Sequence, residues 1–427
     1  MPHNNEVDLE ITNIAHGGVC VARHDGRVVF VSDTLPGERV RARLTDQGHS
    51  RFWRAETVEV LEASAERLPH VWHAASLAHA PEHRAGGAEF GHARLAYQRE
   101  LKRRVIAEAM KRTGHLPDSV LEELRLTVEP APDETTRGTQ WRTRVRLQVD
   151  DSGRLGPFAS RTHAVVPVSD YPLATTALAD AIPFAQRFPE AATVDVVATS
   201  AGDVRVLVTE RSQRRSSKQV RPARVPVIER VGTREFRVDA RGFWQVHQCA
   251  ASTLSAAVAA AVTAESFDPG AANLDLYGGV GLFAAAVGDR FGSTLRITSV
   301  ETDPWASDDA GVNLADWVGA RVYAARVDVF LRDVLVSASA KERDRLRSGT
   351  VVLDPPRSGA GRAVIEPLVL CAPAQIIYVA CDPVALARDT QTLRQHGYDL
   401  EALRVFDLFP NTHHMEAVAT FTRVLTR

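Results

Sequence analysis

Residues 376–397, IIYVACDPVALARDTQTLRQHG, contain the transition that decides the fold. The run IIYVA is rich in β-branched residues and too short for a helix, so it predicts a buried strand. Asp382 suits a helix N-cap, and Pro383 suits the first helical position, where its missing N–H costs nothing. The helix is expected to stop at Gly397, a suitable C′ residue. The stretch therefore predicts a strand that leads directly into a helix.

The same alternation of strand and helix extends over residues 241–427. Further strands are expected at NLDLYGG, ITSVETD, ARVYAAR and TVVLDPP, with helical stretches between them. Such alternation is typical of a parallel, doubly wound α/β sheet of the Rossmann type. The last two apolar runs, LRVFDLF and EAVATFTRVL, follow each other too closely for a crossover helix. We therefore expect them to pair antiparallel at the edge of the sheet.

Two smaller domains are expected before this sheet. Residues 6–60 contain five short alternating runs with turn signals between them, which predicts a closed, OB-like β-barrel over residues 1–62. Residues 141–241 mix strands with Arg-rich loops, so residues 63–240 are expected to form a central, RNA-binding α+β domain. Within it, residues 94–113 have the pattern of an amphipathic helix, which we expect to pack on the C-terminal domain.

The composition is that of a soluble globular protein. Of the 427 residues, 44% are hydrophobic and 24% are charged. No apolar run approaches the roughly 18–20 residues of a membrane span, and the N-terminus lacks the features of a signal peptide. The four cysteines form no CxxC pair, so neither a disulfide framework nor a cysteine metal site is indicated. We expect the protein to reside in the cytoplasm.

Charge is distributed unevenly along the chain. The net charge of −2 argues against a wholly basic nucleic-acid binder. Residues 205–241 nevertheless carry eleven Lys or Arg against four Asp or Glu, and residues 94–112 carry seven against two. Such runs are either solvated faces or phosphate-contacting stripes, so RNA or DNA remains a possible partner. Five histidines lie within residues 63–92, but no cysteine joins them, and no metal site is expected.

Residues at the ends of the first three strands describe a nucleoside site. Gly279 and Gly281 permit a tight turn and a close approach of a ligand to the backbone. Ala284 occupies the place of the third glycine of the dinucleotide fingerprint, which disfavours a pyrophosphate. Glu301 could accept hydrogen bonds from ribose hydroxyls, and Asp328 could bind an adenine amine. A nucleoside site without a phosphate cradle suits S-adenosylmethionine, although either acid could instead be a helix N-cap.

The reactive side chains are expected on one rim of the sheet. Ligands of open α/β sheets bind outside the carboxyl ends of the strands, where Tyr277, Asp354 and Cys381 lie. Glu416 begins the final strand and shares this rim if that strand is antiparallel, and Arg357 can reach an anion. Cys381 also precedes a helix N-terminus, which is expected to lower the pKa of its thiol. The alternative is a cysteine that packs as a small hydrophobe.

A thiolate, a carboxylate and a methyl-sulfonium cofactor on one rim suit a particular reaction. The Cys381 thiolate adds to an electron-poor carbon, and the neighbouring carbon takes the methyl group. The Glu416 carboxylate then removes a proton, and the thiol leaves. Cys249 and Cys371 keep the interpretation of packed hydrophobes.

Four motifs, DLYGGVGLF, VLDPPRSG, YVACDPVALARD and FPNTHHME, resemble in order and spacing those of the RNA uracil-C5 methyltransferases. GFWQVHQCA at residues 242–250 resembles that family's Phe-Gln-Val-Asn segment, and residues 6–60 resemble a TRAM domain. The resemblance covers nearly the whole chain and is weakest around residues 160–230. It implies S-adenosylmethionine-dependent methylation of uracil C5 in RNA, with ribosomal RNA favoured over transfer RNA by the TRAM domain.

The resemblance also implies roles for individual residues. Cys381 is expected to be the nucleophile on uracil C6, and Glu416 the base that takes the C5 proton. Gly279 and Gly281 are joined as expected cofactor contacts by Gln245, Tyr277, Leu282, Glu301, Asp328 and Asp354. The flipped target base and its RNA are expected to contact Arg142, Phe243, Pro355 and Arg357. Residues 241–427 would be the catalytic domain of a monomer.

The sequence departs from the family at three places. The usual Ser-Cys-Asn-Pro is Ala380-Cys381-Asp382-Pro383, and the negative charge of Asp382 opposes formation of the thiolate. His247 replaces the usual Asn. The cysteines that hold an iron–sulfur cluster in many relatives are absent from residues 63–92, so no such cluster is expected. The hydrophobic effect or a salt network must order that segment instead.

Two other classes of protein remain as alternatives. A nucleotide-dependent oxidoreductase would use the same sheet, but the missing third glycine and the Cys-Asp-Pro turn argue against it. A non-catalytic RNA-binding protein would use the barrel alone, but the retained Cys381 and Glu416 argue against that.

Overall fold

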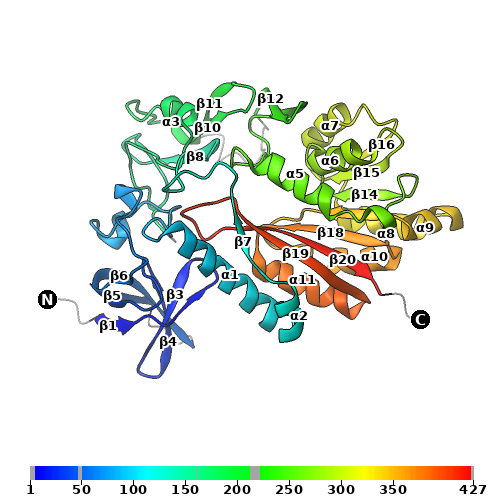
Figure 1. The fold of residues 1–427 in the computed structure, drawn as a ribbon. Coiled ribbons are helices and arrows are strands. Elements are labelled where there is room, and N and C mark those ends of the chain that lie inside the picture. Colours follow the sequence, from blue (N-terminus) through cyan, green and yellow to red (C-terminus); the bar gives the residue numbers. More distant parts are fainter. Residues whose placement is uncertain (1–4, 47–50, 161, 212–221, 425–427) are drawn as a thin grey trace.

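The structure is a computed structural model that describes residues 5–46, 51–160, 162–211 and 222–424 (Figure 1). Its largest element is an eight-stranded sheet built mainly from the C-terminal part of the chain. Five neighbouring strands are parallel, and β20 runs antiparallel to both of its neighbours. The spatial order is β16 (Gly319–Ala324), β15 (Arg296–Glu301), β14 (Asn273–Leu276), β17 (Thr350–Leu353), β18 (Gln375–Ala380), β20 (Glu416–Arg423), β19 (Tyr398–Asp407) and β7 (Val128–Pro130).

Helices cover both faces of this sheet. One face carries α5 (Ala250–Ala261), α6 (Leu282–Phe291) and α7 (Pro304–Asn313), with η3 (Ala264–Ser266) after α5. The other face carries α8 (Val327–Ser337), α9 (Ala340–Arg347), α10 (Arg362–Cys371), α11 (Pro383–Gln395) and α1 (Leu95–Arg112). A parallel sheet between two helical layers confirms the predicted doubly wound α/β fold.

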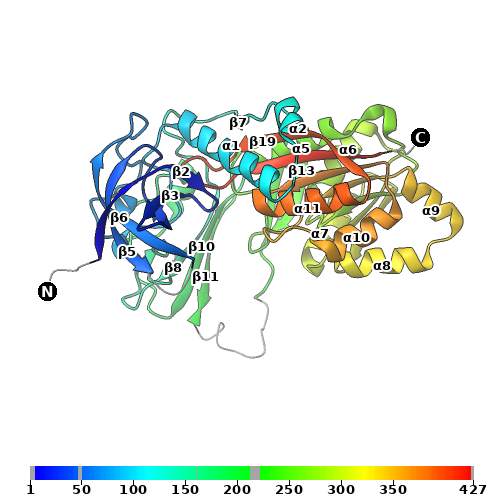
Figure 2. The same cartoon turned by 90° about the horizontal axis from the view of Figure 1, so that it is seen from below.

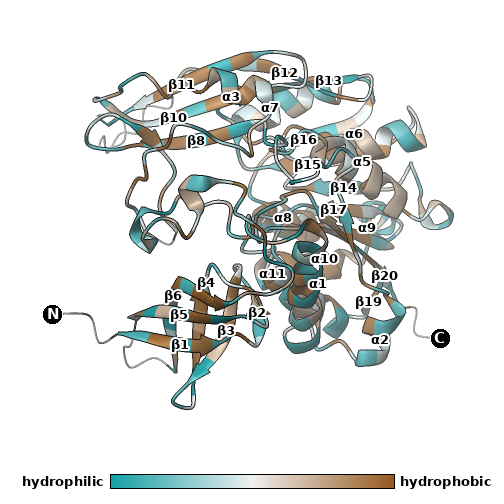
Figure 3. Cartoon of the chain, turned by 60° about the vertical axis from the view of Figure 1, so that its left-hand side comes forward, coloured by the Kyte–Doolittle hydropathy of each residue, from teal (hydrophilic) through white to brown (hydrophobic). Residues whose placement is uncertain are grey.

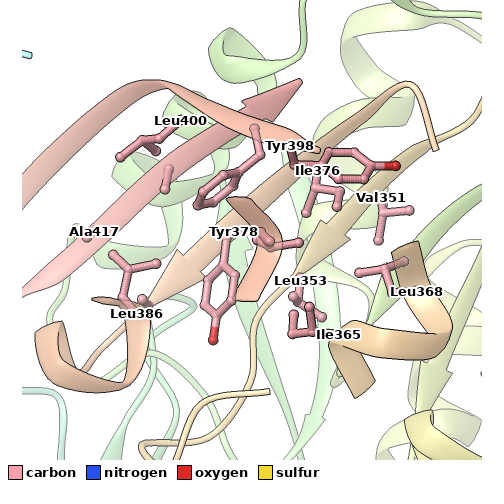
Figure 4. Packing of buried hydrophobic residues seen from close by; sticks show 14 of the residues in the cluster. Val351, Leu353, Ile365, Leu368, Ile376, Tyr378, Leu386, Tyr398, Leu400 and Ala417 are labelled. Atoms are coloured by element: carbon pink, nitrogen blue, oxygen red, sulfur yellow. The ribbon is translucent and has the colours of Figure 1, made fainter. Parts of the chain in front are cut away.

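Strand β18 shows how one run of sequence supplies both cores. Ile376 and Tyr378 pack in the cluster beneath α10 and α11, where Figure 4 shows Tyr378 beside Leu386 of α11 and Ile376 beside Tyr398. Ile377 and Val379 point the other way, into the cluster under α5 and α6. Because successive side chains of a strand face opposite sides, a strand covered on both faces must be apolar throughout.

The transition from β18 to α11 follows the local signals in the sequence. Asp382 is the N-cap, and its Oδ1 accepts hydrogen bonds from the backbone N–H groups of Val384 and Ala385 at 3.0 and 2.8 Å. Pro383 is the first helical residue, and Gly397 has the left-handed φ of +81° that suits a residue just past a helix. These predictions are confirmed.

The edge of the sheet differs from the prediction. β19 and β20 do pair antiparallel, but β20 lies inside the sheet and β19 is not its edge. The edge strand is β7, which pairs parallel with β19 from a part of the chain far upstream. Its three residues are too few to show a periodicity, and Pro130 at its end does not favour a strand, so the sequence carried no signal for it.

The N-terminal domain contains six strands where the sequence predicted five. They are β1 (Glu6–Glu10), β2 (Asn13–Ala15), β3 (Val19–His24), β4 (Arg27–Ser32), β5 (Arg39–Asp46) and β6 (Phe52–Glu62), in the order β1-β5-β6-β4-β3-β2. The first predicted run splits where its hydrogen-bond partner changes. Ile11 N still donates to Glu38 O, just before β5, at 2.9 Å, whereas Thr12 N donates to Val21 O of β3 at 2.8 Å. The second bond links the end of β1 to β3, so the sheet curls into a barrel-like form (Figure 3).

The central region forms its own antiparallel sheet. Its order is β11 (Val204–Glu210), β10 (Ala191–Ala198), β8 (Arg144–Val149) and β9 (Leu155–Gly156). The short helix α3 (Thr176–Ala181) packs on this sheet. The hairpin of β12 (Pro226–Val231) and β13 (Arg234–Asp239) and the short helix α2 (Asp118–Glu123) pack instead on the cores of the large sheet. Figure 3 shows this sheet above the barrel and beside the large sheet.

Residues 63–92 are held in place both by hydrophobic packing and by ion pairs, the two means that the sequence suggested. Trp72 is fully buried in the core of the central sheet, and its indole N–H donates to Asp170 at 2.9 Å. Arg84 donates to the Asp33 carboxylate at 2.8 Å and to Thr57 O at 2.9 Å. The segment, which includes η1 (His73–Ala75) and η2 (Pro81–His83), is thus fixed to the barrel by ion pairs and to the central sheet by packing.

Helix α1 joins the barrel to the large sheet (Figure 2). Leu101 packs in the core of the barrel, whereas Ile106 and Met110 pack in the core of the sheet. Each of the seven basic side chains in residues 94–112 has a carboxylate partner. The buried pair is Lys102 Nζ with Asp407 Oδ1, at 2.5 Å. The basic side chains of this run are therefore paired within the protein, which argues against a phosphate-contacting stripe on α1.

Candidate active site

The pairing of β18 with β20 places two reactive side chains next to each other. The antiparallel register opposes Ala380 and Ala417 at the end of the ladder. The next residue outward on each strand is Cys381 on one and Glu416 on the other. Because β20 is antiparallel to β18, its start lies at the carboxyl ends of the parallel strands, as the sequence suggested.

A cavity of about 1030 Å³ opens at this rim, between the large sheet and the central region. It is lined by most of the residues that the sequence singled out. They are Arg142, Phe243, Gln245, Tyr277, Gly279, Glu301, Asp354, Pro355, Arg357, Cys381 and Glu416. Gly281, Leu282 and Asp328 are not among its lining residues.

The carboxyl groups of the rim raise one another's pKa values. Burial, together with Asp275 and Glu301, raises the pKa of the Asp354 carboxyl to about 8. Burial raises the pKa of Asp275 to about 7, and Ser299 and a backbone N–H only partly oppose this. Burial and Asp354 hold the pKa of Glu416 well above its ordinary value, against the influence of Arg357. A cation placed among these groups would let them ionise, so the cavity is suited to a positively charged ligand.

The Cys381 thiol is not activated in the way the sequence suggested. Burial raises its pKa to about 12, and Glu416, Asp354 and Asp382 add to the rise while Arg357 opposes it. The predicted lowering by the helix N-terminus is therefore wrong for the protein without its substrates. Burial, together with three nearby acidic groups, outweighs the partial charge of one helix end.

The turn after β14 brings backbone close to the cavity. Tyr277 has a left-handed φ of +62°, which is rare for a residue with a side chain and often marks a functional site. Gly279 has a φ of +55° and open space on its Cβ side, and its N–H donates to Glu301 Oε2 at 3.1 Å. This geometry allows a ligand to approach the backbone at Gly279.

The two other glycines of this turn are needed for packing. A Cβ on Gly281 would lie 3.0 Å from the Leu314 side chain, and one on Gly278 would lie 2.0 Å from Ser299 Oγ. Gly278 was not singled out from the sequence, because the crowding comes from the neighbouring strand.

Glu301 and Asp328 are not helix N-caps. The N-cap of α7 is Asp303, and that of α8 is Arg326. Glu301 points its Oε1 at Asp303 N, at 2.7 Å, and its Oε2 at Gly279 N, so it braces the turn that it shares with the cavity. Asp328 is ion-paired with Arg326 at 3.0 Å and Arg332 at 2.7 Å. It adds to the raised pKa of the Tyr277 phenol, so it lies near the cavity although outside its lining.

Comparisons with known proteins identify this arrangement. A family model described as tRNA (Uracil-5-)-methyltransferase matches residues 256–424, and a TRAM domain model matches residues 3–57. A Streptomyces coelicolor protein named as an RNA methyltransferase is 38% identical over 440 residues, which cover 97% of this chain and 92% of that protein. The chain belongs to the RNA uracil-C5 methyltransferase family. The resemblance drawn from the sequence motifs is confirmed.

Two further relatives of this methyltransferase carry more specific names. The 23S rRNA (uracil(1939)-C(5))-methyltransferase RlmD of Shewanella denitrificans is 27% identical, with 97% of this chain and 96% of that protein covered. A solved structure of Pyrococcus abyssi tRNA (uracil-54, C5)-methyltransferase, in complex with S-adenosyl-L-homocysteine, superposes with a TM-score of 0.68. It covers 97% of this chain and 99% of its own at 19% identity, which confirms the fold.

The methyltransferase has one cavity residue of note that the sequence did not single out. Arg241 lines the cavity, and its Nε is buried without a hydrogen-bond partner among the described residues. It lies in the second basic run, whose residues 212–221 fall outside the described part of the chain. Phe243 nearby exposes 74% of its surface to solvent. Arg142 is held by its Nε, which donates to Arg144 O at 2.8 Å.

Within the described residues of the methyltransferase, the donor atoms of three side chains lie close enough together to hold a metal ion. They belong to Asp133, His247 and Cys249. His247 Nδ1 there accepts a hydrogen bond from the Cys249 backbone N–H at 3.0 Å. The five histidines of residues 63–92 do not form such a group in the described structure.

Two remaining features concern the chain as a whole. The four cysteines are free. Within the described part of the chain, no helix combines the length and the apolar character needed to cross a membrane.

Proposed function

We propose that this enzyme methylates C5 of a uridine in ribosomal RNA with S-adenosylmethionine, through a covalent bond between Cys381 and uracil C6. The observation that carries the proposal is the register of β18 and β20, which sets a thiol beside a carboxyl at the rim of an acid-rich cavity. Few reactions need both groups at one carbon–carbon double bond, and methylation at uracil C5 is one of them.

The chemistry of the cavity fits S-adenosylmethionine. Its sulfonium and ammonium groups are cations, and the carboxyls of Asp354, Glu301 and Glu416 line the cavity. Burial raises the pKa values of Asp354 and Glu416, so a bound cation would favour their ionisation. The open backbone at Gly279 admits the cofactor closely, and Glu301 at the end of β15 is placed for ribose hydroxyls. Gln245 and Tyr277 line the same cavity. When bound, the cofactor supplies a methyl group on a cationic sulfur.

In the proposed reaction, Cys381 and Glu416 act in turn on the C5–C6 double bond of uracil. The Cys381 thiol gives its proton to solvent water, and the sulfur electron pair forms the S–C6 bond. The electrons of the C5–C6 double bond then form the bond from C5 to the methyl carbon, whose former sulfur becomes a neutral thioether. Glu416 removes the remaining proton from C5, the double bond re-forms, and the thiolate leaves C6. Arg357 assists both charged states, because it lowers the pKa values of Cys381 and Glu416.

The mouth of the cavity fits a single-stranded RNA segment. Phe243 offers an exposed ring on which a base can stack, and stacking of this kind is worth about 1–3 kcal/mol per base. Arg142 and Arg241 border the same opening and can contact phosphates. A uridine must leave its helix to reach Cys381, which single-stranded or flipped bases do most readily.

Ribosomal RNA is the proposed substrate class, with transfer RNA as the second candidate. The support is that RlmD, whose name specifies 23S rRNA, is matched along nearly its whole length at 27% identity. The second candidate is supported by the fold match to a tRNA enzyme. One chain supplies the cavity, Cys381 and Glu416, so we propose that the enzyme acts as a monomer.

The experiment is a transfer assay with methyl-labelled S-adenosylmethionine and two RNAs, unmodified 23S ribosomal RNA and a mixture of unmodified transfer RNAs. We expect label in 5-methyluridine from the ribosomal RNA. The Cys381→Ala variant should lose at least about 10⁴-fold in rate while it still binds the cofactor. Label in another nucleoside, or full activity of the variant, would contradict the proposal, and label in transfer RNA alone would move it to the second candidate.

A further inference from the structure

The barrel reaches the catalytic residues through the turn between β2 and β3. Residues Ala15–Gly18 of this turn line a cavity of about 120 Å³ together with Cys381, Asp382, His413 and His414. Gly17 and Gly18 have φ values of +83° and +74°. A Cβ on Gly18 would lie 2.8 Å from the His413 Cβ. The turn is thus packed between the loop that carries the nucleophile and the loop that leads to Glu416.

One side chain of the turn touches the residue next to the nucleophile. His16 Nε2 lies 2.8 Å from Asp382 Oδ2, although 366 positions separate the two residues in the chain. The other oxygen, Oδ1, is occupied by the N–H groups of Val384 and Ala385. Each oxygen of Asp382 therefore has its own task, one to cap α11 and one to bind His16.

Asp382 places a carboxylate directly beside the nucleophile, and its charge acts on the thiol. Its carboxylate is one of the groups that raise the pKa of Cys381. Its hydrogen bond raises the pKa of His16, so the imidazole holds its proton to a higher pH than usual. Although burial works the other way, the His16 bond and the helix N–H groups lower the pKa of Asp382. The two side chains therefore favour an ion pair.

We propose that His16 is a positioning residue that neutralises Asp382 and so restores the ability of Cys381 to ionise. The barrel would then serve catalysis as well as RNA binding, because it delivers a cation to the nucleophile loop. This inference rests on the proposed role of Cys381 as the nucleophile. It explains how the enzyme tolerates a carboxylate next to its nucleophile.

The other charged groups around the thiol do not do the same work. Glu416 and Asp354 face Cys381 from β20 and from the end of β17, and Arg357 opposes them. Lys102, which lines the small cavity, is paired with Asp407, and His413 is 3.4 Å from Glu89. Arg357 lies 3.4 Å from His414 Nε2. Among the described residues, His16 is the cation in contact with Asp382.

The test measures the ionisation of the thiol directly. Alkylation of Cys381 by iodoacetamide is followed by peptide mass spectrometry from pH 6 to 9 in wild type, His16→Gln, Asp382→Asn and the double variant. His24→Gln, which alters a second His–Asp pair in the same barrel, is the matched control. Melting temperatures of all five proteins establish that each is folded.

We expect His16→Gln to slow alkylation about 3- to 10-fold near pH 6 to 7, which corresponds to about half to one pKa unit of the thiol. The difference should shrink towards pH 9, because His16 itself loses its proton as the pH rises. Asp382→Asn should speed alkylation, and adding His16→Gln to it should change nothing further. Equal rates in wild type and His16→Gln, or an equal loss in both backgrounds, would overturn the proposal.

A kinetic measurement separates positioning from RNA contact. With methyl transfer as the readout, His16→Gln should lower kcat and leave KM for RNA unchanged. A rise in KM alone would make His16 an RNA contact and overturn the proposal. The alkylation result does not need methyl transfer, so a failure of the proposed function would show as the predicted alkylation pattern in a protein that methylates no RNA.

Discussion

Helix α1 and the cavity at the sheet rim both carry many charged side chains, but they pair them differently. In α1 each basic side chain has a carboxylate beside it, including the fully buried pair of Lys102 and Asp407. In the cavity, burial and neighbouring carboxyls raise the pKa values of Asp354 and Glu416, and Arg241 has a buried Nε without a hydrogen-bond partner among the described residues. Charge that is already paired holds the domains together. Charge that lacks a partner is available for cofactor and RNA.

The largest expected effect is on stability and comes from the paired region. Lys102→Met leaves the Asp407 carboxylate buried without a cation, which should cost about 3–5 kcal/mol in the free energy of unfolding. Denaturant unfolding measures this cost. The double variant Lys102→Met with Asp407→Leu should regain most of it, because an apolar pair fills the same space. A loss below about 1 kcal/mol in the single variant would mean that the pair does not hold α1 to the sheet.

The next effect is on the cofactor and comes from the unpaired region. Asp354→Asn removes one carboxylate that a cationic ligand would meet, so affinity for S-adenosylmethionine should fall by about 1.5–3 kcal/mol, or roughly 10- to 150-fold. Calorimetric titration measures it, with Asp333→Asn on the exposed surface of α8 as the control. An unchanged affinity would remove Asp354 from the cofactor site.

The same carboxyl predicts a dependence of cofactor binding on pH. The pKa of Asp354 is about 8 in the free protein, so the group is largely protonated at pH 6 and must lose a proton to meet a cation. Affinity for S-adenosylmethionine should therefore rise from pH 6 to 8 and level off above that range. Asp354→Asn should make the rise smaller, since Glu416 still contributes. An affinity that falls with pH would contradict the sign of this argument.

A smaller effect is expected on RNA binding. Arg241→Gln should reduce the slope of log affinity against log salt concentration by about 1, because one phosphate contact is lost. The melting temperature should stay the same, since the Nε of Arg241 has no partner in the free protein's described structure. A drop in melting temperature with an unchanged slope would assign Arg241 to the structure instead.

The smallest expected effect concerns the paired charges of α1 and their influence on RNA binding. Arg103 and Arg104 both pair with Glu100 on the exposed face of α1, and exposed pairs of this kind are worth about 0.2–1 kcal/mol. The double substitution to Gln should leave the salt slope of RNA binding unchanged. A reduced slope would show that α1 contacts RNA after all and that pairing in the free protein does not exclude binding.

Much of the fold was accessible from the sequence because its signals are local. The strand before Cys381, the cap at Asp382 and the stop at Gly397 each depend on neighbouring residues, and each is observed. β7 could not be predicted, since a three-residue strand has no periodicity and its partner lies far along the chain. The sixth barrel strand was missed because the hydrogen-bond partner changes between Ile11 and Thr12, inside one apolar run.

The candidate site, like the fold, could be predicted from the sequence only in part. The order of the motifs sufficed to place Cys381 and Glu416 on one rim. The thiol pKa was predicted with the wrong sign, because the helix end is a local feature, whereas the burial of the thiol and its contacts with Glu416 and Asp354 depend on other parts of the chain. The contact of His16 with Asp382 has no local signal, since it depends on how the barrel docks.

The measurement that tests the central claim most directly is the trapping of the covalent intermediate. Without a base at position 416, Glu416→Gln should form the Cys381–C6 bond and transfer the methyl group, but it should not release the product. Incubation of the Glu416→Gln variant with unmodified substrate RNA and S-adenosylmethionine should give a protein–RNA complex that survives denaturing electrophoresis. Its RNA-linked peptide should contain Cys381 and one added methyl group. Normal turnover by Glu416→Gln would contradict the account. A stable complex that still forms when Cys381→Ala is added to Glu416→Gln would contradict it as well.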